Sequence, residues 1–134
     1  MNLVSKLKNK KSLNIIYENN NINSNNLLQI IEHNTIILKK LAVKKKETIA
    51  IVLENGPEFI TSFLSCINSA VAAPLNPNYT VSEFGFYFKD LKPKALITNL
   101  PSSHPSIKTS YKNKVKIIRL EDFHFKIDKK KFEK

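Results

Sequence analysis

Side chains that could carry chemistry are few and widely spaced in this chain. None of the three histidines, His33, His104 and His124, has a second histidine or a cysteine at metal-ligand spacing. Glu121, Asp122 and His124 form a small polar cluster near the end of the chain. A metal site or an acid–base pair there competes with a solvated strand end, and the pattern favours the solvated strand end.

The single cysteine, Cys66, could act as a nucleophile only if it were exposed and placed beside a base. It lies one helical turn from Phe63 and next to Ile67, so we expect a small core residue. A lone thiol excludes an internal disulfide and is typical of a reducing, intracellular compartment.

An aromatic-rich stretch offers a second kind of chemistry, the stacking of nucleic-acid bases. A stacking platform needs its rings on one exposed face. Helical spacing splits these rings between faces, so we expect them to pack in a core. The residues concerned are Tyr79, Phe84, Phe86, Tyr87 and Phe88.

Only two glycines occur, Gly56 and Gly85. A Walker or dinucleotide-type phosphate loop cannot be written with them, and no G-x-S-x-G nucleophile elbow is present. The sequence therefore assigns no catalytic, cofactor-binding or metal-binding residue to this chain.

The elements that would position any such side chain centre on residues 48–76. Thr48–Leu53 is a continuous apolar run, which predicts a strand covered on both faces. Pro57 suits the first position of a helix, and Val71–Leu75 predicts a second strand. Two strands joined through a helix run parallel, with a right-handed crossover. The intervening helix has one apolar stripe at a period of 3.6, formed by Phe59, Ile60, Phe63, Leu64 and Ile67.

Upstream, Leu13–Glu18 is a strand candidate, Asn19–Asn21 a turn, and Ile22 the start of a returning hairpin arm. Ser24 is a plausible N-cap for the next helix. That helix carries one apolar face, formed by Leu27, Ile31, Leu38 and Leu41.

Downstream, Thr80 and Glu83 fit a capping box for a helix that ends near Lys89 or Asp90. Residues 95–98 and 115–120 are predicted strands, residues 101–114 a loop with one or two helical turns, and residues 121–134 a charged, fraying tail. The helix that starts after Thr80 is expected to face the sheet with Val81, Phe84, Phe88 and Leu91.

The order of elements predicts an α/β fold, with a mostly parallel sheet flanked by helices. We expect a basic N-terminal helix or tail over residues 1–12, a partial domain over residues 13–120 and the charged tail over residues 121–134.

The formal net charge of +11 suggests a nucleic-acid-binding protein. However, Arg119 is the only arginine, and specific nucleic-acid recognition relies on the planar fork of arginine. Abundant lysine and asparagine together suggest compositional drift at exposed positions, so a basic nucleic-acid binder is the least favoured alternative. No run approaches the ~18 apolar residues of a membrane span, and Met1–Ser12 lacks the apolar core of a secretory signal.

Lys45–Phe59 (K-K-E-T-I-A-I-V-L-E-N-G-P-E-F) resembles an early segment of the AMP-forming acyl-CoA synthetases, a family of adenylate-forming ligases. That family reads K-G-D-x-V-A-I-x-x-x-N-x-x-E-F there. Ala70–Tyr79, Glu83, Phe84, Tyr87, Asp90 and the strand at Lys94–Ile97 match in register as well. The resemblance covers residues 13–120 and is strongest to the smaller, peroxisomal-type ligases, including the oxalyl-CoA synthetase branch.

Two departures from the family pattern have physical consequences. Lys46 and Ser69 stand where the family prefers glycine. If Ser69 must adopt a left-handed conformation, it costs on the order of 1 kcal/mol. Gly85 inside a helix costs a similar ~1 kcal/mol relative to alanine.

The resemblance implies an ATP-dependent ligase that converts a carboxylic acid to an acyl-adenylate and then to a thioester with CoA. The family's phosphate loop, nucleotide-binding segments and catalytic lysine all follow the matching region. No site residue is therefore transferred to this chain, and ATP, Mg²⁺ and CoA are expected only for a full-length relative. A cytoplasmic or peroxisomal location is implied in the same way.

The chain is thus expected to be an N-terminal ligase fragment that is inactive alone and marginally stable, because an incomplete sheet leaves apolar faces uncovered. The alternative is a non-catalytic interaction module. Such a module would dock through an open sheet edge on the remainder of a ligase or on another protein.

Overall fold

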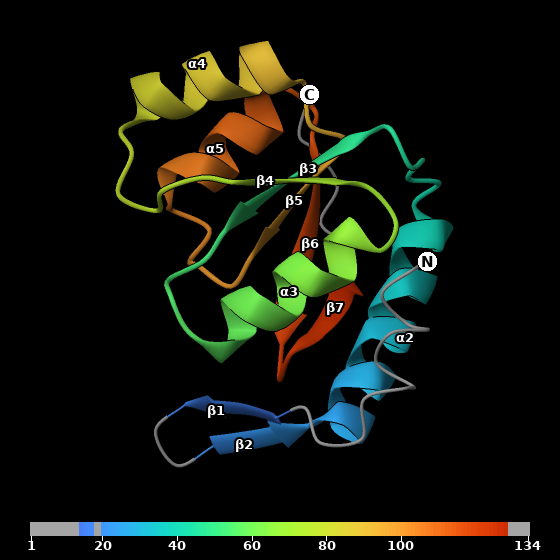
Figure 1. Ribbon diagram of the computed structural model, residues 1–134. Coiled ribbons are helices and arrows are strands. Elements are labelled where there is room, and N and C mark those ends of the chain that lie inside the picture. The colour runs from blue at the N-terminus through green and yellow to red at the C-terminus, as the bar shows by residue number, and fades with distance from the viewer. Residues whose placement is uncertain (1–13, 18–19, 129–134) are drawn as a thin grey trace.

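The computed structural model describes residues 14–17 and 20–128 (Figure 1). The basic N-terminal helix or tail predicted for residues 1–12 lies outside these ranges. In chain order the structure contains β1 (Asn14–Tyr17), β2 (Asn20–Asn23), α2 (Ser24–Lys40), β3 (Thr48–Val52), α3 (Pro57–Ile67), β4 (Val71–Pro74), α4 (Val81–Leu91), β5 (Ala95–Thr98), α5 (Pro105–Lys112), β6 (Lys116–Glu121) and β7 (His124–Ile127).

The main sheet has five strands in the order β4-β3-β5-β6-β7. β3 lies in parallel between β4 and β5, with Ile49 opposite both Ala72 and Ala95. β6 continues the parallel set, and β7 is antiparallel to β6. This arrangement confirms the predicted α/β fold with a mostly parallel sheet, and it places the three predicted strands side by side. The expectation that β4 is buried like β3 and β5 is wrong, because β4 lies at the edge of the sheet and its Val71 is 48% exposed.

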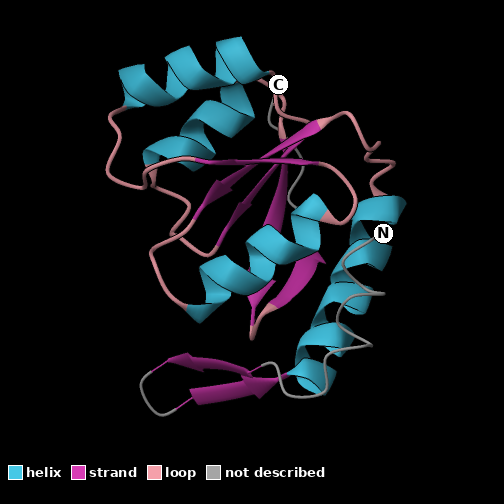
Figure 2. Cartoon of the chain, viewed as in Figure 1, coloured by secondary structure: helices cyan, strands magenta, loops and turns pink. Residues whose placement is uncertain are grey.

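Helices cover the sheet on both faces (Figure 2). Alternate residues of β3 point to opposite faces: Ile49 and Ile51 pack in a cluster with Leu38 of α2, while Ala50 and Val52 pack with residues of α4 and α5. Residues 49–52 are all fully buried, as the continuous apolar run predicts.

Local signals set several helix starts. Pro57 occupies the first turn of α3. The capping box of α4 is complete, since the Glu83 backbone N–H donates to the Thr80 hydroxyl at 3.2 Å and the Thr80 N–H donates to the Glu83 carboxylate at 3.0 Å. The prediction for α2 is wrong by one residue. Asn23 is its N-cap, and the side chain of Asn23 accepts from the Asn26 N–H.

The hairpin β1–β2 confirms the predicted early strand and its return. The turn is narrower than predicted, because Asn20 and Asn21 already belong to β2. Val81 was expected to face the sheet, but it is 57% exposed. As the first residue of α4 it lies ahead of the turn that carries Phe84 onto the sheet.

The fraying predicted from Glu121 onward does not occur over residues 121–127, because these residues complete β6 and form β7. The two turn residues, Asp122 and Phe123, have φ values of 47° and 69°. Positive φ at both central positions is the geometry of tight hairpin turns, usually met by asparagine, aspartate or glycine. Phe123 is held there by packing against a cluster that includes Ile22 and Leu27.

Positive φ also occurs just beyond three helix ends, at Ala42, Lys92 and Lys114. Such positions usually hold glycine. Ser69 is not among the residues with positive φ, so the penalty considered for it does not apply.

Candidate functional site

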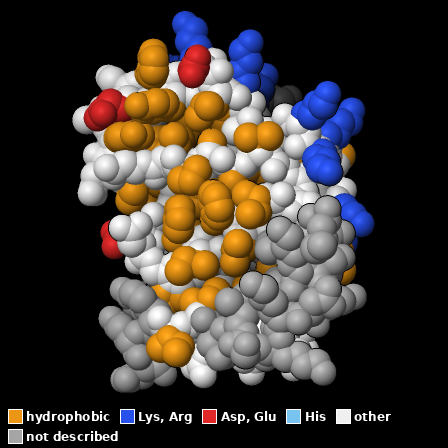
Figure 3. Space-filling model, viewed as in Figure 1, with side chains coloured by type: hydrophobic (Ala, Val, Ile, Leu, Met, Phe, Trp, Pro, Cys, Tyr) orange, Lys and Arg blue, Asp and Glu red, His pale blue; other side chains and the backbone are white. Residues whose placement is uncertain are grey.

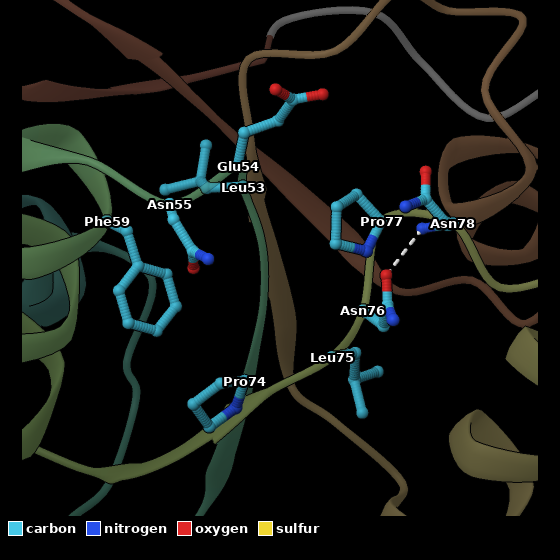
Figure 4. A pocket seen from close by; sticks show the side chains of 9 residues that line it. All are labelled: Leu53, Glu54, Asn55, Phe59, Pro74, Leu75, Asn76, Pro77 and Asn78. Atoms are coloured by element: carbon cyan, nitrogen blue, oxygen red, sulfur yellow. Dashed lines mark hydrogen bonds between the residues drawn. The ribbon is translucent and has the colours of Figure 1, made fainter.

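A pocket of about 610 Å³ lies where β3 and β4 end (Figure 4). The carboxyl ends of parallel strands are where open α/β sheets usually bind ligands. The loop after β3 forms one wall and the loop after β4 forms the other. The residues that line it are Leu53, Glu54, Asn55, Phe59, Pro74, Leu75, Asn76, Pro77 and Asn78.

The pocket wall holds amide and carboxylate groups and no cationic side chain. The Asn76 side chain is already used within its own loop, where it accepts from the Asn78 N–H at 2.8 Å. Among the described residues that line the pocket, Glu54 has the only charged side chain. A polyphosphate requires cations or converging backbone N–H groups, so this wall favours neutral or cationic groups over a nucleotide triphosphate.

The N-terminus of α3 adjoins the pocket. Helix N-termini attract anions, but Glu58 lies in the first turn of α3 and its carboxylate accepts from Asn99 Nδ2 at 3.3 Å. The positive end of the helix dipole therefore already faces a carboxylate of the chain itself.

The direction of the strand connections reverses between β3 and β5. Side-chain hydrogen bonds occupy the sheet end at this switch point. The Thr98 hydroxyl donates to the Val52 carbonyl at 2.8 Å and accepts from the Leu100 N–H at 3.1 Å. Arg119, the one arginine, forms an ion pair with Asp128 at 3.5 Å and donates to the Leu100 carbonyl. These contacts give Arg119 a structural role at the end of the sheet.

His104 also has a structural role. One ring nitrogen, Nε2, lies 2.9 Å from the Pro77 carbonyl, and the other, Nδ1, lies 2.8 Å from the Ser106 hydroxyl. His104 caps α5 by accepting from the Ser106 N–H. It thereby joins the loop after β4 to the start of α5.

The structure brings His33 and His124 together, although 90 residues separate them in the sequence. Their rings meet edge to face with centroids 4.8 Å apart. The neighbouring Glu121 carboxylate forms an ion pair with Lys126 at 2.7 Å. The Nδ1 atom of His124 lies 2.6 Å from the backbone carbonyl of Asp122. Within residues 14–17 and 20–128 no three His, Cys, Asp or Glu side chains converge as metal ligands.

Cys66 is fully buried in the core, and desolvation by burial raises the pKa of its thiol. The thiolate is the nucleophilic form of cysteine. The predicted role as a small core residue agrees with this environment.

The aromatic residues divide as their spacing predicts. Phe84 and Phe88 are buried against the sheet, and Phe86 is 67% exposed on the opposite side of α4. Tyr79 and Tyr87 stack with centroids 5.0 Å apart, and a hydrogen bond with Tyr87 raises the pKa of Tyr79. One exposed platform of rings is not formed by these residues.

One buried polar residue was missed by the sequence analysis. Asn34 of α2 is fully buried, and its Nδ2 donates to the Ser65 hydroxyl at 3.1 Å and the Phe123 carbonyl at 3.2 Å. Its Oδ1 accepts from the Phe125 N–H at 2.8 Å. Asn34 thus joins α2, α3 and the β6–β7 hairpin. The apolar periodicity of α2 gave no signal for it.

The isoleucines of α3 are exposed, whereas Phe59 and Phe63 are partly buried against the core cluster that contains Ile49 and Ile51 of β3. The fully buried residues of α3 are Thr61, Ser62, Ser65 and Cys66, whereas Ile60 and Ile67 are 40% and 44% exposed. Figure 3 shows apolar side chains gathered over the middle of this face of the molecule, with lysines toward its margins.

No helix in the described ranges is both long and apolar enough to cross a bilayer.

Comparison with known proteins gives consistent results. The family model described as AMP-binding enzyme matches residues 8–133. Oxalate–CoA ligase from Saccharomyces cerevisiae is 50% identical over 56 residues, which cover 41% of this chain and 10% of that ligase. Oxalate–CoA ligase from Arabidopsis thaliana is 34% identical over 80 residues, which cover 59% of this chain and 16% of that ligase.

Solved structures share the fold at lower identity. A mutant form of coronafacic acid ligase from Pectobacterium brasiliense superposes with a TM-score of 0.78 at 23% identity, over 98% of this chain and 27% of that one. Apo MatB from Rhodopseudomonas palustris superposes with a TM-score of 0.75 at 20% identity, over 90% and 26%. The chain thus spans about a quarter of these solved structures and a smaller share of the curated relatives.

Proposed function

Because this chain belongs to the AMP-binding enzyme family, we propose that it is the N-terminal part of an ATP-dependent, AMP-forming acyl-CoA synthetase and is not catalytic alone. It is homologous to the N-terminal region of acyl-CoA ligases. The proposed reaction of the whole enzyme has two steps. A carboxylate attacks the α-phosphate of ATP and releases pyrophosphate, and the CoA thiolate then displaces AMP from the acyl-adenylate.

The proposal rests on a mismatch between the groups that line the pocket and the groups that activation of a carboxylate by ATP requires. Activation of a carboxylate by ATP requires donors and cations around the transferring phosphate. The pocket at the ends of β3 and β4 has one carboxylate and no cation in its wall, and the chain has only two glycines. In this proposal the 134 residues supply scaffold, and the nucleotide-binding groups come from the rest of the enzyme.

The substrate is proposed to be a carboxylic acid. Two of the curated relatives are oxalate–CoA ligases, so a small dicarboxylate is the first candidate to assay. A cytoplasmic or peroxisomal location stays part of the same proposal.

ATP–pyrophosphate exchange tests the proposal directly. The purified 134-residue chain is assayed with ATP, Mg²⁺ and a panel of carboxylic acids that includes oxalate, beside a full-length oxalate–CoA ligase as positive control. We expect exchange from the control and none from the chain. Exchange by the chain itself would show that the nucleotide site lies within these residues.

A second candidate function is a non-catalytic interaction module, and the exposed apolar side chains of α3 favour it. In this reading the chain binds a protein partner without contributing to ligation. A monodisperse complex with a protein that has no ligase activity would support it. A basic nucleic-acid binder is the third candidate. It predicts sequence-independent retention on DNA or RNA that falls steeply with salt, and the absence of such retention would remove it.

A further inference from the structure

We propose that the outer face of α3, together with the adjoining side of β4, is the surface on which the remainder of the ligase packs, and that this surface accepts that remainder when it is supplied as a separate polypeptide. The inference rests on the proposed function, because it names the surface through which this fragment contacts the rest of the ligase. The α3 face is defined here as Phe59, Ile60, Phe63, Ile67, Ala72 and Pro74.

Helix α3 leaves apolar side chains exposed on its outer side. The fully buried residues of the helix are small ones, whereas Ile60 and Ile67 are 40% and 44% exposed. Phe59 and Phe63 are only partly covered, with ring centroids 6.1 Å apart. Contiguous apolar side chains on a surface mark an interaction site, and α3 concentrates them on one side.

Basic residues are unevenly distributed along the chain. The chain has 22 lysines and arginines, yet residues 47–88 contain none and include Glu47, Glu54, Glu58 and Glu83. If lysine accumulated wherever a position is exposed, the exposed positions of this stretch would have acquired it too. Its absence from α3 and β4 indicates that these positions are covered when the protein functions. Figure 3 shows the same region without cationic side chains over α3.

The free edge of β4 is a poor site for adding a strand. The Val71 N–H donates to the Glu47 carbonyl just before β3, and the Leu75 N–H donates to the Ile51 carbonyl of β3. In a parallel ladder the backbone groups of Ala72 and Pro74 therefore point to the free edge. Pro74 has no N–H to donate, and proline is a common device for blocking an exposed edge. Docking is therefore expected to use side chains of the α3 face more than the β4 backbone.

The occupant follows from the comparisons. In solved relatives the matching region is about a quarter of the chain, so the surfaces that this unit exposes have some three quarters of a ligase available to cover them. A second copy of this chain is a weaker candidate, because each copy carries a formal net charge of +11 and like charges oppose association.

The test uses three forms of the 134-residue chain and a partner. The three forms are the parent, an α3-face variant (Ile60→Lys with Ile67→Lys) and a matched control (Ile16→Lys with Ile36→Lys). Both variants replace exposed isoleucines, and those of the control lie outside residues 47–88. The partner is the yeast oxalate–CoA ligase without the region that corresponds to residues 8–133. Each form is co-expressed with this partner, and co-purification is measured by affinity capture followed by size-exclusion chromatography.

We expect the parent and the control to co-purify with the partner, and the α3-face variant to be captured at least about tenfold less, as for the loss of a central contact residue. Equal capture of the face variant, no capture of the parent by a partner that is soluble when expressed alone, or self-association of the parent through this face would each overturn the inference.

A covalent chimera, in which the chain replaces the matching region of the same ligase, covers the case of a partner that does not fold alone. There the face variant should lower the soluble yield at least about tenfold relative to the control. The same substitutions in the isolated chain should leave the melting temperature unchanged or raise it. Equal yields of the two chimeras would contradict the inference.

Exchange activity separates this inference from the proposed function. If the complex forms and depends on the α3 face but shows no ATP–pyrophosphate exchange, the proposed function fails and the contact surface stands. If exchange is restored and the face variant is as active as the parent, the function stands and the surface is wrong.

Discussion

Helices α3 and α4 have the same length of 11 residues, and each follows a strand of the same sheet. α4 buries Phe84 and Phe88 at 0% and 2% exposure. α3 instead buries small polar residues and leaves its isoleucines partly exposed. The comparison teaches that an apolar stripe identifies a helix but does not say which surface the stripe will face.

Chemistry explains why α3 can turn a polar side inward. The Ser65 hydroxyl donates to the Thr61 carbonyl at 2.7 Å, and the Thr61 hydroxyl donates to the Glu58 carbonyl at 3.1 Å. Serine and threonine bond their own helix backbone in this way, so their burial leaves few unpaired groups. Their small side chains also let α3 lie close to β3 and β4.

The largest expected effect comes from truncating one phenylalanine on each helix. Phe84→Ala should lower the free energy of unfolding by about 3–5 kcal/mol, because it removes a fully buried ring. Phe63→Ala in α3 should lower it by less than half of that, since its ring is only partly covered. Urea denaturation followed by circular dichroism measures both. Equal losses would break the contrast between the helices.

The next effect tests the polar inner side of α3. Asn34→Ala removes the partners of Ser65 and Phe125, and it should lower the free energy of unfolding by about 2–3 kcal/mol because the Phe125 N–H is left buried and unpaired. Asn26→Ala, at an exposed position of the same helix, is the matched control and should change it by less than about 0.5 kcal/mol. A small effect at Asn34 would mean that water replaces its hydrogen bonds.

The two glycines allow a further comparison of α3 with α4, since Gly56 lies at the start of α3 and Gly85 lies inside α4. Gly56 has a φ of 153°, which strains any L side chain, so Gly56→Ala should destabilise the chain by about 1–2 kcal/mol. Gly85→Ala meets no atom within 4 Å of the new Cβ and should stabilise it by about 0.5–1 kcal/mol. Thermal melts of the two variants should shift in opposite directions, and shifts of the same sign would refute this account.

The smallest expected effect is a pH dependence of the free energy of unfolding, which comes from Cys66 on the inner side of α3. Burial raises the pKa of Cys66, so the unfolded chain releases its thiol proton at a lower pH than the folded chain. Stability from this residue is therefore present below the ordinary cysteine pKa and lost above it, by about 0.7 kcal/mol between pH 8 and pH 9. Cys66→Ala should remove this part of the slope. An identical slope in the variant would show that the thiol is hydrated.

Sequence patterns predicted the parts of the fold that depend on local signals. The continuous run at residues 48–53, the proline at Pro57 and the capping box at Thr80 each act within a few residues, so their outcomes follow from the residues themselves. The buried face of α2 was predicted for the same reason. The parallel orientation of β3 and β4 followed from the helix that connects them, whereas the order β4-β3-β5 was not predicted.

The features that escaped prediction depend on distant partners. β7 forms because Phe125 is buried and its N–H reaches Asn34, 91 residues earlier. The proximity of His33 and His124 has the same origin. Periodicity predicted an apolar stripe on α3 but not that part of it would be exposed. It carries no information on which elements pack against each side of a helix. For the candidate pocket, the sequence indicated the missing phosphate loop but not the meeting of the loops after β3 and β4.

The central position of β3 has a consequence for the growing chain on the ribosome. β3 is the first strand of the five-stranded sheet to be translated, and its neighbour β5 ends at Thr98. At about 5–20 residues per second, β3 waits on the order of 2–9 s for that neighbour. A buried strand left open for seconds is a substrate for nascent-chain chaperones. Each later strand can then add to an edge that already exists.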